Sequence, residues 1–293
     1  MRSSNPVFSR RREFATFGQP GQFQQGQNAQ YSQQGYGQPQ PHVQPGYPQP
    51  GQQEPGAFGL DYGRPQQTRD AMTLDDVVMR TGMLFAVLLA VAAVTWGAVS
   101  FGLIPLTAAM PLWLLAIVVT LGLGIWINMS RTVRPGLILT YAAIEGFFVG
   151  LVSAIFESFM DGIVFQAVLA TLCVFGVMLA AYRFRIIRAT NKLYRFLAIA
   201  VPAYMVFVII NLGLVLFTDV NLRMGPLGLA ISLFAVGLAS LCLILDFDQV
   251  ERGIANRLPR EHAWMAAFGL MVTLVWLYIE MLRLIMILRS FAE

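Results

Sequence analysis

The stretch Gly225–Leu245, GPLGLAISLFAVGLASLCLIL, contains no charged side chain. An α-helix that crosses the hydrocarbon core of a bilayer needs about 20 apolar residues, and this stretch is long enough to supply them. The chain continues as Asp-Phe-Asp-Gln-Val-Glu-Arg-Gly, so the apolar run ends in a cluster of charge. The stretch predicts a transmembrane helix whose C-terminus lies near Asp246.

Further apolar runs of similar length recur along the chain after residue 72. Together with the first, they are Thr81–Phe101, Leu106–Met129, Gly136–Phe156, Gly162–Tyr182, Phe196–Phe217, Gly225–Leu245 and Trp264–Leu288. Short connections rich in Gly and Pro join them, as in a compact antiparallel bundle. The chain is 56% hydrophobic and only 12% charged, whereas soluble domains are about 25% charged. We therefore predict an all-α fold: a polytopic membrane protein with a bundle of seven transmembrane helices.

The residues before this bundle have a different composition. Residues 1–72 are rich in Gln, Gly, Pro and Tyr and poor in aliphatic side chains, so they cannot bury enough apolar surface to order themselves. We predict a disordered tail over residues 1–72 and a transmembrane domain over residues 73–293. A partner-binding role for the tail, through its spaced tyrosines, is the alternative to a passive tether. Thr73 and Asp76 have the spacing of a helix-capping box and predict where order begins.

The basic residues predict the orientation of the bundle. Cationic side chains concentrate in loops that stay in the cytoplasm. Most cations lie in the tail and in the second, fourth and sixth connections, whereas the odd-numbered connections hold only Arg223. We therefore expect a cytoplasmic N-terminus and a C-terminus outside. A re-entrant final segment, with six true spans, is the alternative.

Ionisable residues inside the apolar runs are candidates for function, because each is costly in hydrocarbon. Glu145 lies near the middle of the third run with no cation one turn away, and it is either functional or a structural carboxyl bonded between helices. Glu280 and Arg283 lie three residues apart in the last run and can pair on one helix face. The simplest interpretation is a self-neutralising intramembrane pair.

Two further acids follow the sixth run. Asp248 has Arg252 four residues on and is expected to form an interfacial ion pair. Asp246 has no such neighbour, and a helix C-terminus disfavours negative charge. Asp246 therefore requires a cation from elsewhere. Arg131 and Arg134 are the candidates, because the second and sixth connections are predicted to share one side of the membrane.

No pattern of enzymatic chemistry is present. Asp246 and Asp248 are neighbours on one strip of chain, whereas aspartyl proteases bring two carboxylates together from separate segments. The sequence has no nucleophile elbow and no phosphate-binding loop, and its two histidines are isolated. We expect no catalytic residues, no metal site and no cofactor. No basic patch suited to nucleic acid is present.

Several segments resemble the Bax inhibitor family, in particular its bacterial, YccA-like branch of transmembrane Bax inhibitor motif proteins. The resemblance covers residues 72–288. It rests on Met72-Thr-Leu-Asp-Asp-Val-Val, Glu145-Gly-Phe-Phe-Val-Gly-Leu-Val-Ser153, Gly225-Pro-Leu-Gly228, Leu245-Asp-Phe-Asp248 and Leu277-Tyr-Ile-Glu280.

This resemblance implies a seven-helix fold in a bacterial inner membrane. It also implies a passive, pH-sensitive leak of calcium or another cation. In the calcium-leak members a carboxylate at the end of the sixth helix pairs with one in the seventh, and a basic residue of the second helix helps to close the path. Asp246, with Asp248 as its rival, matches the first carboxylate, and Glu280 replaces the usual aspartate of the second. The second run has no basic residue, so Arg131 or Arg134 would have to replace it.

Other bacterial members of the family bind a membrane-bound protease instead. The alternative function is therefore a non-transporting regulator or adaptor of another membrane complex. The partners expected from the sequence are the lipid bilayer, a permeant cation and, for the adaptor, a membrane protein.

Overall fold

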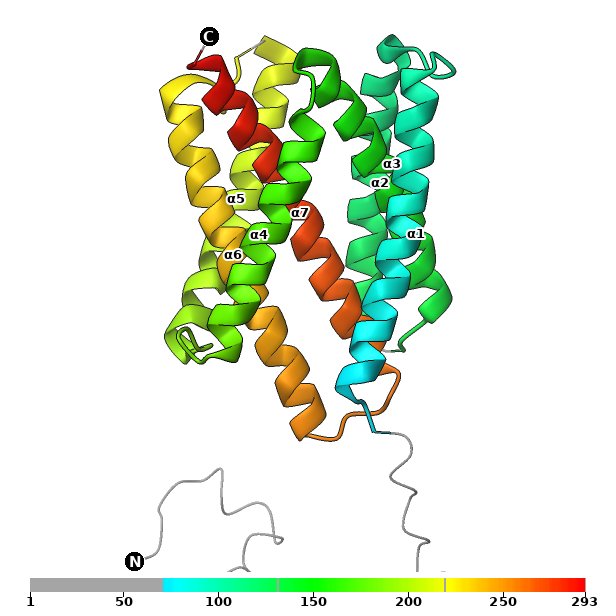
Figure 1. Ribbon diagram of the computed structural model, residues 1–293, viewed down its shortest axis with the longest axis vertical. Helices are drawn as coiled ribbons and strands as arrows, with labels where there is room; N and C mark the ends of the chain where they lie inside the picture. Colours follow the sequence, from blue (N-terminus) through cyan, green and yellow to red (C-terminus); the bar gives the residue numbers. More distant parts are fainter. Residues whose placement is uncertain (1–70, 131, 219, 293) are drawn as a thin grey trace, which may run out of the picture. The chain divides into compact units, whose positions relative to one another are not determined.

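The computed structural model describes residues 71–130, 132–218 and 220–292, which form seven α-helices in antiparallel succession (Figure 1). All seven are long and apolar enough to cross a membrane, which confirms the predicted all-α, seven-span fold. The predicted disorder of the tail falls almost wholly outside the described residues. The helices are α1 (Leu74–Ser100), α2 (Leu106–Met129), α3 (Pro135–Phe159), α4 (Ile163–Arg183), α5 (Asn191–Thr218), α6 (Gly225–Ala255) and α7 (His262–Ser290).

The first helix begins where the capping pattern predicts. The Thr73 hydroxyl accepts a hydrogen bond from the backbone N–H of Asp76 at 3.2 Å, and the Asp76 carboxylate accepts one from the backbone N–H of Thr73 at 3.3 Å. Two of the backbone donors that have no partner inside the helix are thereby satisfied. The Asp76 side chain also pairs with Arg260 at 2.7 Å, so the start of α1 is fixed to the turn before α7.

Helix α6 is longer than its apolar run. The sequence predicts an end near Leu245, but the helix continues to Ala255. Asp246 therefore lies inside α6, and the expectation that it sits at a helix C-terminus is wrong. The physical reason is that loss of hydrophobicity marks the membrane boundary and does not stop a helix. Because the helix dipole acts only within the last turn, it does not oppose the charge of Asp246.

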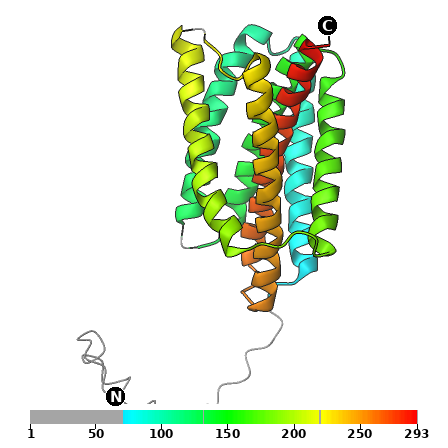
Figure 2. The same cartoon turned by 90° about the vertical axis from the view of Figure 1, so that its left-hand side faces the viewer.

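Helix α7 occupies the middle of the bundle. It contacts α1, α3, α4 and α6, and Figure 1 shows it running obliquely between α1 on one side and α4 and α6 on the other. Figure 2, turned by 90°, shows α7 behind α6. By contrast, α2 packs mainly on α3 and α5 mainly on α6, and both expose large apolar side chains. The outer helices thus present the lipid-facing surface and α7 the interior.

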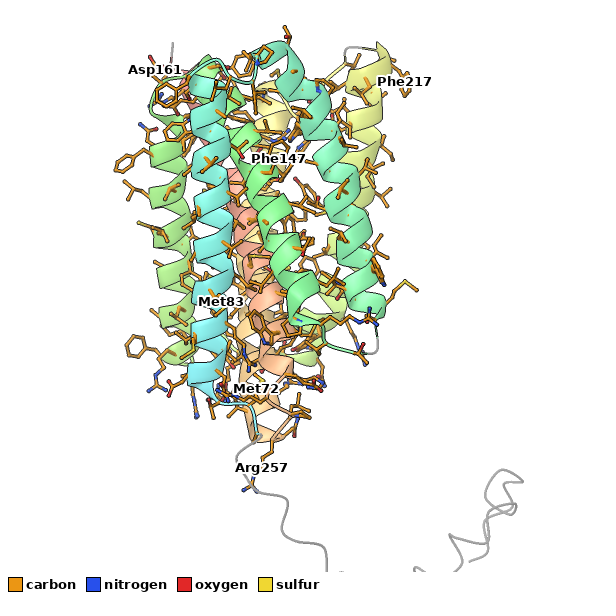
Figure 3. All side chains as sticks on the ribbon, turned by 90° about the vertical axis from the view of Figure 1, so that its right-hand side faces the viewer. Met72, Met83, Phe147, Asp161, Phe217 and Arg257 are labelled. Carbon is orange, nitrogen blue, oxygen red and sulfur yellow. The ribbon has the colours of Figure 1, made fainter. Side chains whose placement is uncertain are left out.

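The two ends of the bundle are defined by contacts between distant segments. At one end the backbone N–H of Met72 donates to the carbonyl of Leu258 at 2.8 Å. At the other end Arg289 donates to the carbonyl of Asp161 at 3.0 Å. Figure 3 shows Met72 and Arg257 at the first end and Asp161 and Phe217 at the second.

These contacts decide between a spanning and a re-entrant last segment. Helix α7 is continuous over 29 residues. At 1.5 Å per residue it is about 43 Å long, more than the roughly 30 Å of a hydrocarbon core. The re-entrant alternative is therefore wrong.

Helices α1 and α3 approach each other closely at two glycines. A Cβ atom added at Gly146 would lie 2.4 Å from the carbonyl oxygen of Leu88, and one at Gly150 would lie 2.6 Å from that of Ala92. The spacing of four residues puts both glycines on one face of α3. Small residues at this spacing let transmembrane helices pack backbone against backbone.

We predict that Gly146→Ala destabilises the bundle, because the new methyl group meets the backbone of α1, which cannot move aside. The expected loss in unfolding free energy is about 1–3 kcal/mol, as for overpacked cores. Unfolding in detergent micelles, followed by circular dichroism, measures it. Gly176→Ala in α4 is the matched control, since no heavy atom lies within 4 Å of its Cβ position, and it should leave stability unchanged. Equal stability of the two variants would contradict the close α1–α3 contact.

Candidate functional site

Asp246 lines a cavity of about 360 Å³ between α6 and α7. Its Oδ2 atom is buried and has no hydrogen-bond partner among the described residues. Asn128, Gln249, His262 and Thr273 supply further polar groups to the cavity wall, which is otherwise made mainly of apolar side chains such as Met72, Met265 and Phe268. Among the described residues, no arginine or lysine lines this cavity, so its lone carboxylate can attract a cation.

Asp248, the rival of Asp246, has a different environment. Its carboxylate pairs with Arg252 at 2.6 Å and accepts a hydrogen bond from the Tyr194 hydroxyl at 2.8 Å. The Arg252 guanidinium also lies 5.3 Å from the ring centroid of Tyr194. The predicted interfacial pair is present, and Asp248 is satisfied without contributing to the wall of the Asp246 cavity.

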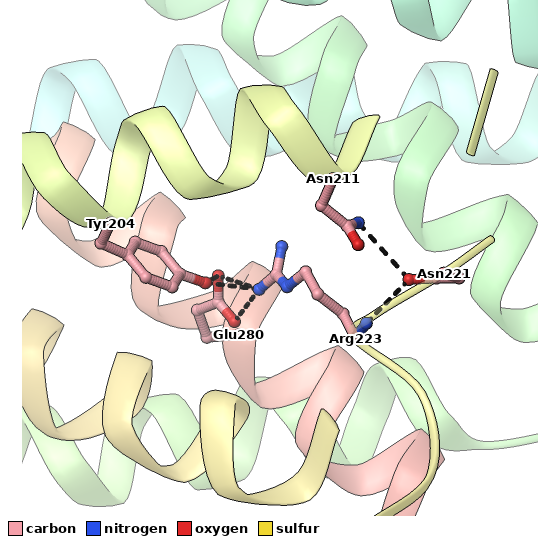
Figure 4. A network of polar contacts seen from close by, with 5 residues as sticks. All are labelled: Tyr204, Asn211, Asn221, Arg223 and Glu280. Atoms are coloured by element: carbon pink, nitrogen blue, oxygen red, sulfur yellow. Dashed lines mark hydrogen bonds and ion pairs between the residues drawn. The ribbon is translucent and has the colours of Figure 1, made fainter. Parts of the chain in front are cut away.

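Glu280 belongs to a second polar cluster, shown in Figure 4. The Nη2 atom of Arg223 donates to both carboxylate oxygens of Glu280, at 2.6 and 2.8 Å, and the Tyr204 hydroxyl donates to Oε1 at 2.6 Å. Arg223 is 3% exposed and Glu280 is 2% exposed. We call Tyr204, Arg223 and Glu280 the buried ionic cluster. It joins α5, the connection before α6, and α7.

The predicted Glu280–Arg283 pair is therefore wrong. Glu280 is paired with Arg223, and the buried Nε atom of Arg283 has no hydrogen-bond partner within the described part of the chain. The reason is that Arg223 enters from another segment and binds both carboxylate oxygens. Spacing along one helix does not report such a partner.

The chain before α6 is shaped to turn Arg223 inward. Asn211 of α5 accepts a hydrogen bond from the backbone N–H of Leu222 at 2.9 Å, and Asn221 accepts one from the backbone N–H of Arg223 at 3.0 Å. Gly225 then takes a positive φ of 66°, a conformation that favours glycine. At Gly228 a Cβ atom would lie 2.4 Å from the carbonyl carbon of Arg223, so a side chain there would displace the loop.

The two predicted gate carboxylates do not meet. Both oxygens of Glu280 are bound within the buried ionic cluster, and Asp246 shares its cavity with Thr273. Thr273 and Glu280 lie seven positions apart on α7, or about 10 Å along the helix axis.

Of the two predicted cation partners of Asp246, the structure describes only Arg134. Arg131 lies outside the described residues, and Arg134 is exposed, with no ion pair to Asp246. Arg223, which the sequence shows only as the single cation of the odd-numbered connections, is the arginine that enters the bundle. Its isolation there, just before Gly225 and Pro226, is the signal that could have identified it.

Glu145 is a third buried carboxyl. It is 6% exposed, and its Oε2 atom has no hydrogen-bond partner among the described residues. Tyr141, one turn earlier on the same face of α3, packs edge-on against Phe268 of α7 with ring centroids 4.9 Å apart. Because Phe268 also lines the Asp246 cavity, this face of α3 is turned toward the same interior. Over the described residues, no group of three or more His, Cys, Asp or Glu side chains is placed to hold a metal ion.

Seven apolar helices that enclose buried acids and the buried Arg223 define a multi-pass membrane protein with a polar interior. The family model described as Bax inhibitor 1 like matches residues 5–290. The chain belongs to the Bax inhibitor family, as the sequence motifs indicate. A comparison with curated proteins finds no match.

We predict that Arg223→Gln and Glu280→Gln each lower the unfolding free energy by about 3–5 kcal/mol, because each leaves a buried charge without its partner. The double variant should lose less than the sum of the two single losses, since it leaves neither charge behind. Denaturant unfolding in micelles measures all three. Arg252→Gln, which breaks a pair at an exposed arginine, is the control and should cost about 1 kcal/mol or less. Strictly additive losses would contradict the coupling between Arg223 and Glu280.

Proposed function

We propose that this protein is a passive cation leak of a bacterial inner membrane, with calcium as the permeant ion and no enzymatic activity. The observation that supports this most directly is the arrangement of charge along the contact between α6 and α7. The Asp246 cavity lies toward the end that holds Met72, and the buried ionic cluster lies further along α7 toward the end that holds Asp161. Acidic groups in a membrane interior mark candidate ion paths.

In this proposal the described structure is the closed state. Leu277 separates Thr273 from Glu280 along α7, and Leu243 lies one turn before Asp246 on α6; both have 0% exposure. These buried leucines lie between the levels of the two carboxylates and interrupt the polar path. The guanidinium of Arg223 adds a positive charge that repels an approaching cation. Opening requires a shift between two conformations, which typically differ by a few kcal/mol.

The roles of the charged groups follow from their surroundings. Asp246, with an unpaired oxygen in a cavity, attracts the cation. Glu280 holds Arg223 in place and reduces its repulsion of the ion. Arg223 thereby takes the part for which Arg131 and Arg134 are the candidates from sequence. Asp248, already paired with Arg252, has no part in the path.

We predict that calcium flux into proteoliposomes responds to these charges with opposite signs. Asp246→Asn should lower the flux by roughly tenfold, since about 1.4 kcal/mol of lost attraction corresponds to that factor. Glu280→Gln should lower it too, because the charge of Arg223 is then unbalanced, whereas Arg223→Gln should raise it. A calcium-sensitive dye inside the vesicles measures the initial rate.

Two variants serve as controls for the flux measurement. Asp248→Asn should change the flux little, because it breaks only an interfacial pair. If the Glu145 carboxyl is structural, Glu145→Gln should lower the unfolding free energy more than it changes the calcium flux. The proposed leak is wrong if the folded, reconstituted wild-type protein gives no calcium flux above that of empty liposomes. That result would favour a non-transporting regulator of another membrane complex.

We also propose that the N-terminus and the even-numbered connections face the cytoplasm, on the basis of their excess of arginine and lysine. Single cysteines at Ile187 and Asn256, in a background without Cys173 and Cys242, should react with a membrane-impermeant maleimide only from the cytoplasmic side. A cysteine at Asp161 should react only from outside. Labelling of Asp161 from the cytoplasm alone would reverse the proposed orientation.

A further inference from the structure

The segment Ala71–Asp76, which we call the N-terminal strap, lies across the turn between α6 and α7. Ala71 forms an antiparallel bridge with Pro259, and the backbone N–H of Met72 donates to the Leu258 carbonyl at 2.8 Å. The Asp76 carboxylate accepts a hydrogen bond from Nε of Arg260 at 2.7 Å. The strap therefore contacts three consecutive residues of one turn.

The side chain of Met72 forms part of the wall of the Asp246 cavity, together with Gly253 near the end of α6 and Leu258 of the turn. It is 3% exposed, and its Cε atom lies 3.2 Å from the position that a Cβ atom would take at Gly253. The absence of a side chain at Gly253 thus makes room for the thioether. Because the strap's backbone bonds fix Met72 in this position, the strap covers the end of the cavity that faces the turn.

The contacts that hold the strap are of a kind that can be released. The Arg260 side chain is 59% exposed, and ion pairs at such positions contribute little to stability. The other attachments are one antiparallel bridge and the packing of one flexible methionine. Ala71, Met72 and Thr73 precede α1, so lifting the strap disturbs at most the first turn of that helix.

We propose that the strap is a removable cap that controls access of water and ions to Asp246 from this end of the bundle. Residues 1–70 join the chain directly before Ala71, so any interaction that pulls on them acts on the cap first. An effect of the cap on calcium flux rests on the proposed leak function, whereas the covering of the cavity by the strap does not depend on it.

The test of the cap is the reactivity of a cysteine inside the cavity. Ala266 lines the cavity and offers a small site for a reporter, Ala266→Cys, in a background that lacks Cys173 and Cys242. The rate of labelling by a membrane-impermeant maleimide is measured on the purified protein. Arg260→Gln should raise this rate by roughly fivefold, because it releases the strap from an exposed pair. Met72→Ala should raise it at least as much, because it uncovers the cavity directly.

Arg252→Gln is the matched control, since it removes another exposed cation at the same end of the bundle without touching the strap. It should leave the labelling rate unchanged. If Met72→Ala fails to fold, the labelling rate of Arg260→Gln alone tests the cap. Arg260→Gln is expected to fold because the Arg260 side chain is exposed. Labelling that is equally slow in wild type, Arg260→Gln and Met72→Ala, or that rises as much in Arg252→Gln, would overturn the cap.

A disulfide that holds the strap in place tests the cap and the proposed leak function separately. Opposed residues of an antiparallel bridge have Cα atoms about 4.5–5.5 Å apart, a distance that a disulfide can span. Ala71→Cys with Pro259→Cys, oxidised, should lower calcium flux severalfold, with recovery after reduction. If labelling responds to the strap while no variant carries calcium, the cap is supported and the leak is contradicted. If the protein carries calcium and its flux is the same with the disulfide formed and reduced, the cap does not control access to Asp246.

Discussion

Hydrocarbon offers no hydrogen-bond partner, and the structure of the described chain follows from that constraint. Backbone groups are satisfied inside helices, as any segment that crosses a bilayer requires. Several hydroxyl groups follow the same rule: Thr95, Thr120, Ser153 and Ser240 donate to carbonyl groups one turn earlier on their own helices. Nη2 of Arg223, the Tyr204 hydroxyl and both carboxylate oxygens of Glu280 bond to one another. Within the described chain, Asp246 is one of several buried groups that keep a polar atom without a hydrogen bond, and its free oxygen lies beside a cavity.

The helices could be predicted from the sequence because the thickness of the bilayer fixes their minimum length. Their ends were harder, since α6 continues for ten residues past Leu245 in a polar sequence that still favours a helix. The start of α1 could be predicted because a capping box is a local pattern, formed by Thr73 and Asp76 alone. Local patterns of this kind need no knowledge of tertiary structure.

The partners of the buried charges could not be predicted in the same way. Glu280 has a plausible partner three residues away, yet it binds an arginine 57 positions earlier in the chain. That contact depends on Asn211, Asn221 and Gly225, which together turn a loop inward, and no spacing rule describes them. The same holds for Asp76, which has Arg80 one turn ahead but pairs with Arg260. In both cases a residue distant in sequence provides the better geometry.

The distance between the two carboxylates has an electrical consequence. Asp246 shares its cavity with Thr273, and Glu280 lies about 10 Å further along α7, or roughly one third of a 30 Å hydrocarbon core. One elementary charge that crosses the whole membrane potential gains about 2.3 kcal/mol per 100 mV. A divalent ion that moves between the two levels would therefore gain about 1.5 kcal/mol per 100 mV, or roughly a tenfold change in occupancy. In the proposed leak, the resting voltage of a cell would be comparable with the few kcal/mol that separate the closed and open conformations.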